Sequence, residues 1–400
     1  MVHASDPIQP TIVRTSSPLV IALAGLTALG LALGIGRFAF TPILPMMRQD
    51  AVVSVGQGGW LASANYFGYL LGALSAVALR IRATTAIRVG LVVIALGTVS
   101  MGLARNFAAW LVLRALAGVG SAWVLVFGSA WALGKLNAAG RPLLRGLVFA
   151  GVGAGITVAG LICVALMHWG ALSPRAWQGL GIIAPVGTMA IWRTLRTDAG
   201  SRTQGQPQTG QGCRWNFDSV RLVLCYGAFG FGYIIPATFV PAMARELVKD
   251  PLVFGWSWPI FGIAAAGTRF VGNRRLWAVS HLIMALGVSA PVMWPTIDGI
   301  MIAAFLVGGT FMIPTMTGMQ EARMVGGSHA TSLMAVMTAA FATGQIGGPL
   351  LVTYAVGLKG DLSRPLLVAC LLLVVSAGAL CRPRPFLYAS ATEDVGAEPS

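Results

Sequence analysis

The chain has 400 residues, of which 56% are hydrophobic and only 10% are charged, and its formal net charge at pH 7 is +15. Soluble domains carry about 25% charged residues, so this composition excludes an ordinary soluble protein and indicates a multi-pass membrane protein. The excess of basic residues could indicate nucleic-acid binding, but these residues lie in short segments between apolar runs, where the positive-inside rule for membrane proteins places them.

The apolar runs reach the roughly 20 residues that a bilayer-spanning helix needs. They do not alternate apolar with polar residues, as the strands of a membrane barrel would. In the first half of the chain we expect spans at 18–40, 58–79, 86–104, 107–131, 146–168 and 176–195, and in the second half at 219–241, 252–272, 277–296, 299–318, 329–357 and 364–381.

The segment between the two halves, 196–218, is rich in Gly, Gln and Thr and has the composition of a flexible linker. The predicted fold is therefore an all-α membrane protein with twelve transmembrane helices in two six-helix halves. The predicted divisions are an N-terminal tail at 1–17, a first bundle at 18–195, the linker at 196–218, a second bundle at 219–381 and a C-terminal tail at 382–400.

An internal repeat supports two related halves. The stretch GIGRFAFTPILPMM, which begins at residue 34, returns as GFGYIIPATFVPAM, which begins at residue 230. The same offset carries the Gly-Trp pair at 59–60 onto the pair at 255–256. Repeats of this kind are typical of transporters whose substrate sites lie between the repeats near the middle of the bilayer.

The basic residues predict an orientation. Eighteen of the 27 Lys and Arg residues fall on the side of the predicted tails and linker, seven fall on the opposite side, and two lie inside spans. Because the richer side of a membrane protein faces the cytoplasm, we expect a multi-pass protein of a bacterial-type inner (plasma) membrane with both termini and the linker in the cytoplasm.

Two stretches resemble motifs of the major facilitator superfamily. LVLRALAGVGSA at 111–122 is similar to the R-x-x-x-G-x-G signature of its fourth helix, and FATGQIGGP at 341–349 is similar to the pattern of its eleventh helix. The first copy of the repeat, followed by GGWLASANYFGYLLGA at 58–73, resembles the YbfB/YjiJ-type branch. The resemblance covers nearly the whole chain. It implies alternating access with the first and fourth helices lining one cavity, and it implies no firm substrate.

One part of the chain departs from that superfamily. The usual G-x-x-x-D-R-x-G-R-R loop after the second helix has Ala76 in place of the acid, although Arg80 and Arg82 remain. The equivalent stretch of the second half, TRFVGNRR at 268–275, also lacks the acid. Since the resemblance gives those acids a role in closing the inner gate, the way in which this protein closes its inner side stays open.

Arg37 and Arg114 are the two basic residues inside predicted spans. A charge at the bilayer centre costs at least ~2.5–3.5 kcal/mol, which makes both residues functional candidates. Counted from the expected span ends, both lie roughly 10–15 Å deep, and two cations at similar depth suit an anionic substrate. Structural alternatives stay open for both: Arg114 could bond backbone carbonyls, and Arg37 could snorkel or cap a proline-broken turn.

Uncharged polar residues complete the predicted substrate-binding set: Asn65, Tyr66, Tyr226, Tyr233 and Gln345. Tyr226 and Tyr233 are seven residues apart and therefore share one face of the seventh helix. Hydrogen bonding between helices is the alternative for each of the five.

Glycines and prolines inside the spans are predicted to serve helix packing or to act as hinges, because glycine lets helices approach closely in lipid and proline disturbs a helix. They are Gly34, Gly36, Pro45, Gly118, Gly120, Gly151, Gly155, Gly230, Gly232, Pro241, Gly344, Gly348 and Pro349.

The sequence indicates transport rather than catalysis. The five cysteines form no C-x-x-C pair and no histidine cluster accompanies them, so we expect no metal and no cofactor. No HxxxD, HExxH or GxSxG motif is present, so we expect no catalytic residues. No Asp or Glu occupies the interior of a predicted span, which argues against a carboxylate proton relay.

The predicted function is secondary active transport of a small polar or anionic organic solute. Efflux of hydrophobic or drug-like compounds is the alternative, and Met312, Met316, Met334 and Met337 favour it. The expected partners are a small-molecule substrate and the lipid bilayer, with no nucleic acid and with the protein as a monomer. Substrate identity, direction of transport and coupling ion stay open.

Overall fold

The computed structural model describes residues 17–50, 53–78, 81–141, 143–196, 215–267, 273–327, 330–359 and 362–381. The predicted linker and both predicted tails lie almost wholly outside these ranges. Every regular element in the described ranges is a helix. The elements are α1 (Pro18–Leu29), the π-helix η1 (Gly30–Ile35), α2 (Phe40–Gln49), α3 (Val55–Ala78), α4 (Ala83–Leu103), α5 (Phe107–Ala138), α6 (Leu144–His168), α7 (Ser173–Trp192), the 3₁₀-helix η2 (Thr194–Arg196), α8 (Phe217–Leu247), α9 (Pro251–Phe254), α10 (Ser257–Ala266), α11 (Arg274–Met293), α12 (Ile297–Thr310), α13 (Met312–Gly326), α14 (Ala330–Lys359) and α15 (Ser363–Cys381).

Nine segments of the described chain are long and apolar enough to cross a membrane. They are Pro18–Gln49, Ala83–Leu103, Phe107–Ala138, Leu144–His168, Phe217–Leu247, Arg274–Met293, Ile297–Gly326, Leu333–Ala355 and Ser363–Cys381. Pro251–Ala266 is a shorter apolar stretch. The described residues thus confirm the expectation of an all-helical membrane protein.

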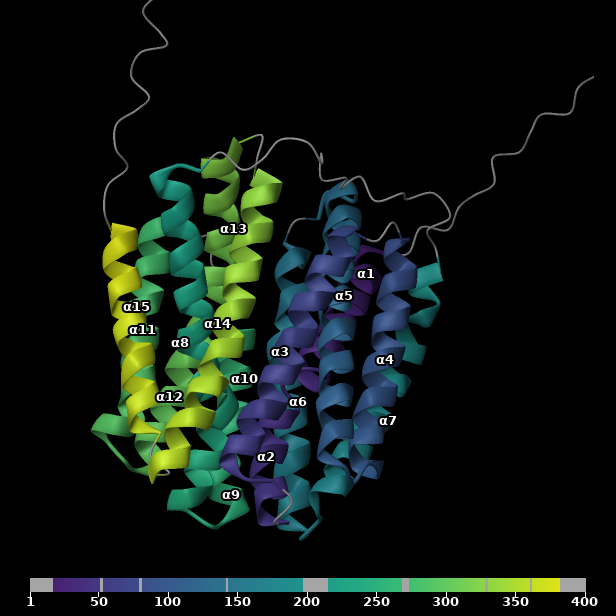
Figure 1. The fold of residues 1–400 in the computed structure, drawn as a ribbon. Coiled ribbons are helices and arrows are strands. Elements are labelled where there is room, and N and C mark those ends of the chain that lie inside the picture. The colour runs from purple at the N-terminus through teal and green to yellow at the C-terminus, as the bar shows by residue number, and fades with distance from the viewer. Residues whose placement is uncertain are drawn as a thin grey trace, which may run out of the picture.

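The helices form two groups that lie side by side, α1 to α7 and α8 to α15 (Figure 1). Contacts between the groups are made by α3 with α14, by α6 with α10, and by α2 with α8. In Figure 1, α2 and α9 lie at the same end of the molecule, which is called the α2/α9 end below. The boundary between the groups follows these three helix pairs, and it brings both copies of the sequence repeat to the middle.

The first predicted span, 18–40, does not end where the sequence suggested. The π-helix ends at Ile35, a turn follows at 36–39, and α2 continues the path to Gln49. Backbone bonds before the turn have π-helical spacing, from Gly36 N to Leu31 O at 3.0 Å and from Phe38 N to Leu33 O at 2.9 Å. Pro42 has no N–H to offer the carbonyl of Phe38 and falls in the first turn of α2, where proline is tolerated.

Two further predicted spans are also broken. The span at 252–272 is divided into α9 and α10, and the span at 299–318 into α12 and α13. Each break precedes a proline: Pro259 leaves the carbonyl of Gly255 without its helical donor, and Pro314 does the same to Thr310. The sequence predicts the crossings but not these interruptions, because a proline alone does not say whether a helix bends or divides.

Ten of the glycines singled out above lie where two helices approach closely. A Cβ added at any of them would lie closer than 3.0 Å to a neighbouring atom. These positions are Gly34, Gly36, Gly118, Gly120, Gly151, Gly155, Gly230, Gly232, Gly344 and Gly348. The tightest approach among these ten is that of α5 to α3, where a Cβ at Gly118 would lie 2.0 Å from the carbonyl oxygen of Asn65. A larger residue there would push the two backbones apart.

Candidate functional site

Arg37 lies on the turn that interrupts the first helical path, and its side chain reaches the second helix group. It is 4% exposed. Its Nη2 donates to the hydroxyl of Tyr233 on α8 at 3.4 Å, and Gln345 Nε2 on α14 donates to the same hydroxyl. A chain of three buried polar side chains therefore crosses from one group to the other.

Aromatic rings lie on both sides of this row of polar side chains. The guanidinium carbon of Arg37 lies 4.2 Å from the ring centre of Tyr69, 5.1 Å from that of Tyr66 and 5.3 Å from that of Phe38. These distances allow cation–π attraction. On the other side the Tyr233 ring stacks with Phe229 at 5.1 Å, and Phe311 and Phe341 each lie 5.8 Å away; these three phenylalanines are called the phenylalanine cluster below.

Arg37 retains unused hydrogen-bonding capacity. Its Nε has no hydrogen-bond partner among the described residues, and neither does Gln345 Oε1. No carboxylate of the described ranges forms an ion pair with Arg37; the ion pairs present involve other arginines. A buried charge without a counter-ion is costly, so this guanidinium is suited to a ligand that brings a negative charge.

Arg114 on α5 serves the broken turn itself. Its Nη1 donates to the carbonyl of Gly36 at 3.4 Å and its Nη2 to the carbonyl of Arg37 at 3.1 Å. Asn65 on α3 donates to the carbonyls of Gly36 at 3.3 Å and Arg114 at 2.9 Å. Buried carbonyls need donors. This geometry matches the structural alternative for Arg114, that of an arginine bonded to backbone carbonyls.

The contacts across the boundary follow the sequence repeat. Arg37 and Tyr233 are 196 residues apart, and so are Thr41 and Ala237, whose hydroxyl and carbonyl are 2.8 Å apart. That separation equals the offset between the two copies of the repeat. Each copy therefore touches its own counterpart, as residues do beside a twofold axis.

Further contacts between the groups lie toward the α2/α9 end. Arg48 Nη1 forms an ion pair with Glu246 Oε1 at 2.7 Å. Arg245 Nη1 donates to the carbonyl of Pro45 at 2.8 Å. These two contacts, called the α2–α8 tie below, hold the groups together at that end.

The structure brings together most, not all, of the predicted binding residues. Arg37, Tyr66, Tyr233 and Gln345 meet between the groups, and the Tyr66 hydroxyl lies 3.2 Å from Thr238 Oγ1 on α8. Arg114 and Asn65 lie behind them on the turn. Tyr226 joins the aromatic side of the site instead, since its ring centre lies 5.2 Å from that of Phe341 and 5.7 Å from that of Phe229.

Sequence reasoning missed the phenylalanine cluster. Phe341 stands four residues before Gln345 on α14, and helical spacing could have placed the two on one face. Phe311 falls at the break between α12 and α13, so no periodic signal pointed to it.

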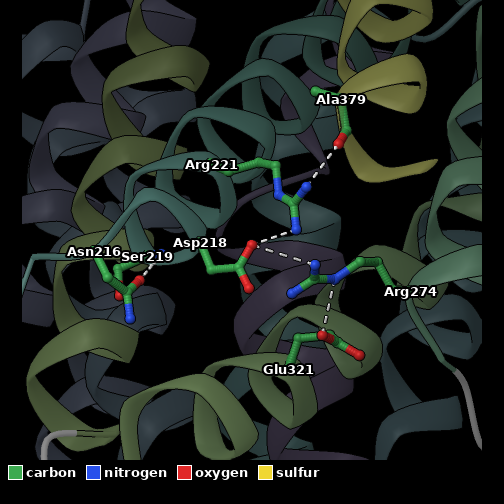
Figure 2. A network of polar contacts seen from close by, with 7 residues as sticks. All are labelled: Asn216, Asp218, Ser219, Arg221, Arg274, Glu321 and Ala379. Atoms are coloured by element: carbon green, nitrogen blue, oxygen red, sulfur yellow. Dashed lines mark hydrogen bonds and ion pairs between the residues drawn. The ribbon is translucent and has the colours of Figure 1, made fainter. Parts of the chain in front are cut away.

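A separate polar cluster lies in the second group at the start of α8 (Figure 2). The Asp218 carboxylate pairs with Arg221 and lies 3.5 Å from Arg274 Nη1 on α11, while Arg274 Nε donates to Glu321 Oε2 on α13 at 3.0 Å. Arg221 also donates to the carbonyl of Ala379 on α15 at 3.4 Å. This cluster joins four helices, and it holds Glu321 in an ion pair.

A family model described as an uncharacterised MFS-type transporter, YbfB, matches residues 29–381. The chain belongs to this YbfB-type family of MFS transporters. The match includes the break in the first helical path, Arg37 and all elements from η1 to α15.

The chain is also similar to the uncharacterised MFS-type transporter YceJ of Bacillus subtilis (strain 168), at 34% identity over 94 residues. That similarity covers 23% of this chain and 24% of YceJ. Membership of the YbfB-type family makes the chain a multi-pass membrane protein of a transporter family, and the resemblance noted in its motifs is confirmed. The family description names no solute.

Proposed function

We propose that this YbfB-type protein is a secondary transporter that moves a small polar or anionic organic solute by alternating access. The observation that carries the proposal is Arg37, a buried cation without a carboxylate partner among the described residues, which reaches across the boundary between the helix groups. In transporters built from repeats, the substrate site lies at the repeat interface.

The arrangement proposed for the membrane has twelve crossings in two six-helix halves. The nine apolar segments supply nine of them, and α3, α7 and the α9–α10 pair supply the other three. The equality between the repeat offset and the separation of the contacting pairs supports the duplication. The distribution of basic residues favours an inner membrane with the α2/α9 end outside.

Arg37, Tyr66, Tyr233 and Gln345 form the proposed binding site, with Tyr226 beside them. Arg114 and Asn65 position the turn that carries Arg37. The alternative of hydrophobic efflux draws less support, because it would leave the buried Arg37, which has no carboxylate partner among the described residues, without a role.

Uptake and efflux of a panel of organic anions by cells lacking the gene tests the proposal. The wild-type gene should restore transport of at least one anion, and Arg37→Gln should remove it. Arg88→Gln is a matched control, because Arg88 also lies against an aromatic ring, 4.6 Å from the ring centre of Trp192, but its hydrogen bond goes to the Trp192 carbonyl within the first group. Equal transport by both variants would refute a role for Arg37.

A further inference from the structure

The site distinguishes between classes of anion, because only one of its two arginines is available to a ligand. Arg114 donates to two backbone carbonyls and lies 4.8 Å from the ring centre of Phe40. Arg37 donates to the neutral Tyr233 hydroxyl at 3.4 Å and lies against the neutral Tyr69 side chain, and its Nε has no hydrogen-bond partner among the described residues. One available cation matches one negative charge on the ligand.

A ligand ammonium group would find no counter-ion here. In the described ranges the acids lie in or beside the ends of helices or in the separate cluster of Figure 2, and none contacts Arg37, Tyr233 or Gln345. Those acids are Asp50, Asp218, Glu246, Asp250, Asp298 and Glu321. An ammonium at the site would therefore be buried unpaired beside a like charge.

Tyr233 shows which shape of ligand the site accommodates. Its ring lies among the phenylalanine cluster, and its oxygen accepts hydrogen bonds from Arg37 and Gln345. The protein thus places an aromatic ring with a terminal oxygen acceptor against its own cation. An aromatic acid presents the same two features, with a charged oxygen that makes a stronger bond to guanidinium.

We propose that the substrate is an aromatic monocarboxylate, whose carboxylate replaces the Tyr233 hydroxyl on Arg37 and whose ring packs against the aromatic side chains around Arg37 and Tyr233. This inference rests on the proposed function. Offset or edge-to-face ring contacts favour an aromatic over a saturated ring of similar size by roughly two- to tenfold in affinity.

Thermal unfolding of the purified full-length protein, titrated with defined compounds, tests the inference. Benzoate should bind several-fold more tightly than cyclohexanecarboxylate, and at least about tenfold more tightly than acetate, phthalate, phenylalanine or benzylamine. Phenylalanine or acetate binding as tightly as benzoate, with binding still lost in Arg37→Gln, would overturn the substrate class and leave the proposed function standing.

Variants of Arg37 test whether its guanidinium binds the carboxylate. Arg37→Gln should weaken benzoate binding about tenfold or more, and Arg37→Lys should weaken it less, because lysine keeps the charge and loses the planar fork. Arg88→Gln should bind benzoate like the wild type. Unchanged benzoate affinity in a folded Arg37→Gln protein would overturn both the substrate class and the proposed function.

Tyr233→Phe tests whether the ligand carboxylate takes the place of the Tyr233 hydroxyl on Arg37. It keeps the ring and removes the hydroxyl that competes for Arg37, so benzoate should bind several-fold more tightly than to the wild type. Unchanged or weaker benzoate binding by the folded variant would overturn the replacement, as would the absence of benzoate binding to the folded wild-type protein.

Discussion

At the scale of single residues, the two intramembrane arginines differ in what their guanidinium groups contact. The partners of Arg114 are backbone carbonyls at the break in the first helix, which are part of the fold. Arg37 instead donates to the Tyr233 hydroxyl of the other helix group. The same residue type therefore bonds backbone carbonyls at one position, and at the other it supplies the cation of the proposed binding site.

Arg114→Gln should lower the free energy of unfolding by about 2 kcal/mol or more, because two buried carbonyls lose a charged donor. Denaturant titration in detergent micelles measures the loss. Arg37→Gln should cost less stability, since it leaves no backbone carbonyl without a donor. An Arg114→Gln protein as stable as the wild type but unable to bind anions would return Arg114 to the substrate-binding set.

At the scale of elements, the α2–α8 tie holds the two groups together at the α2/α9 end. The Arg48–Glu246 pair is partly exposed, with 26% and 52% of the side chains accessible, so it contributes at most about 1 kcal/mol. The Arg245 bond to the Pro45 carbonyl is partly buried. In the proposed alternating-access cycle, a weak tie suits a contact that has to open and close.

Arg48→Gln should increase exposure of the residues beneath the tie. Ala237, which accepts a hydrogen bond from Thr41, is fully buried, and Ala237→Cys provides a site for a membrane-impermeant thiol reagent. Adding Arg48→Gln should speed its labelling by up to about fivefold, the effect of about 1 kcal/mol on a two-state population. Lys249→Gln is the control, because Lys249 donates within its own group to the Arg245 carbonyl. Equal labelling rates in all three backgrounds would show that the tie does not govern opening.

The polar cluster of Figure 2 also connects elements, because it joins α8, α11, α13 and α15. Glu321→Gln removes one carboxylate from Arg274 and should lower the free energy of unfolding by about 2 kcal/mol, less than loss of a fully isolated buried pair, since Asp218 remains. Substrate affinity should not change. Loss of proton-driven accumulation with intact exchange would instead make Glu321 a proton carrier.

At the scale of the whole molecule, the two copies of the repeat meet at the boundary between the helix groups, where the proposed site lies. Apolar run length and the repeat predicted helical crossings and a central Arg37. Tertiary contacts could not be predicted in the same way: the partners of Arg114 are carbonyls at a break in the first helical path, and Phe311, which lies against Tyr233, stands between α12 and α13. Neither feature has a periodicity that a sequence displays.

Reporter fusions test the proposed topology. A periplasm-active reporter fused after residue 206, in the predicted linker, should be silent, and one fused after Lys249, at the α2/α9 end, should be active, because most basic residues fall on the linker side. The reverse pattern would invalidate the orientation.

The central claim is that Arg37 binds an anionic solute between the two halves. Exchange of a labelled organic anion, chosen from those transported in cells, across proteoliposomes containing purified protein measures this most directly. Wild-type and Arg88→Gln proteins should exchange the anion with the same half-saturating concentration, whereas Arg37→Gln should need at least about tenfold more, as expected for loss of a charge-assisted bond. A folded Arg37→Gln protein that exchanges the anion with wild-type affinity would contradict the account.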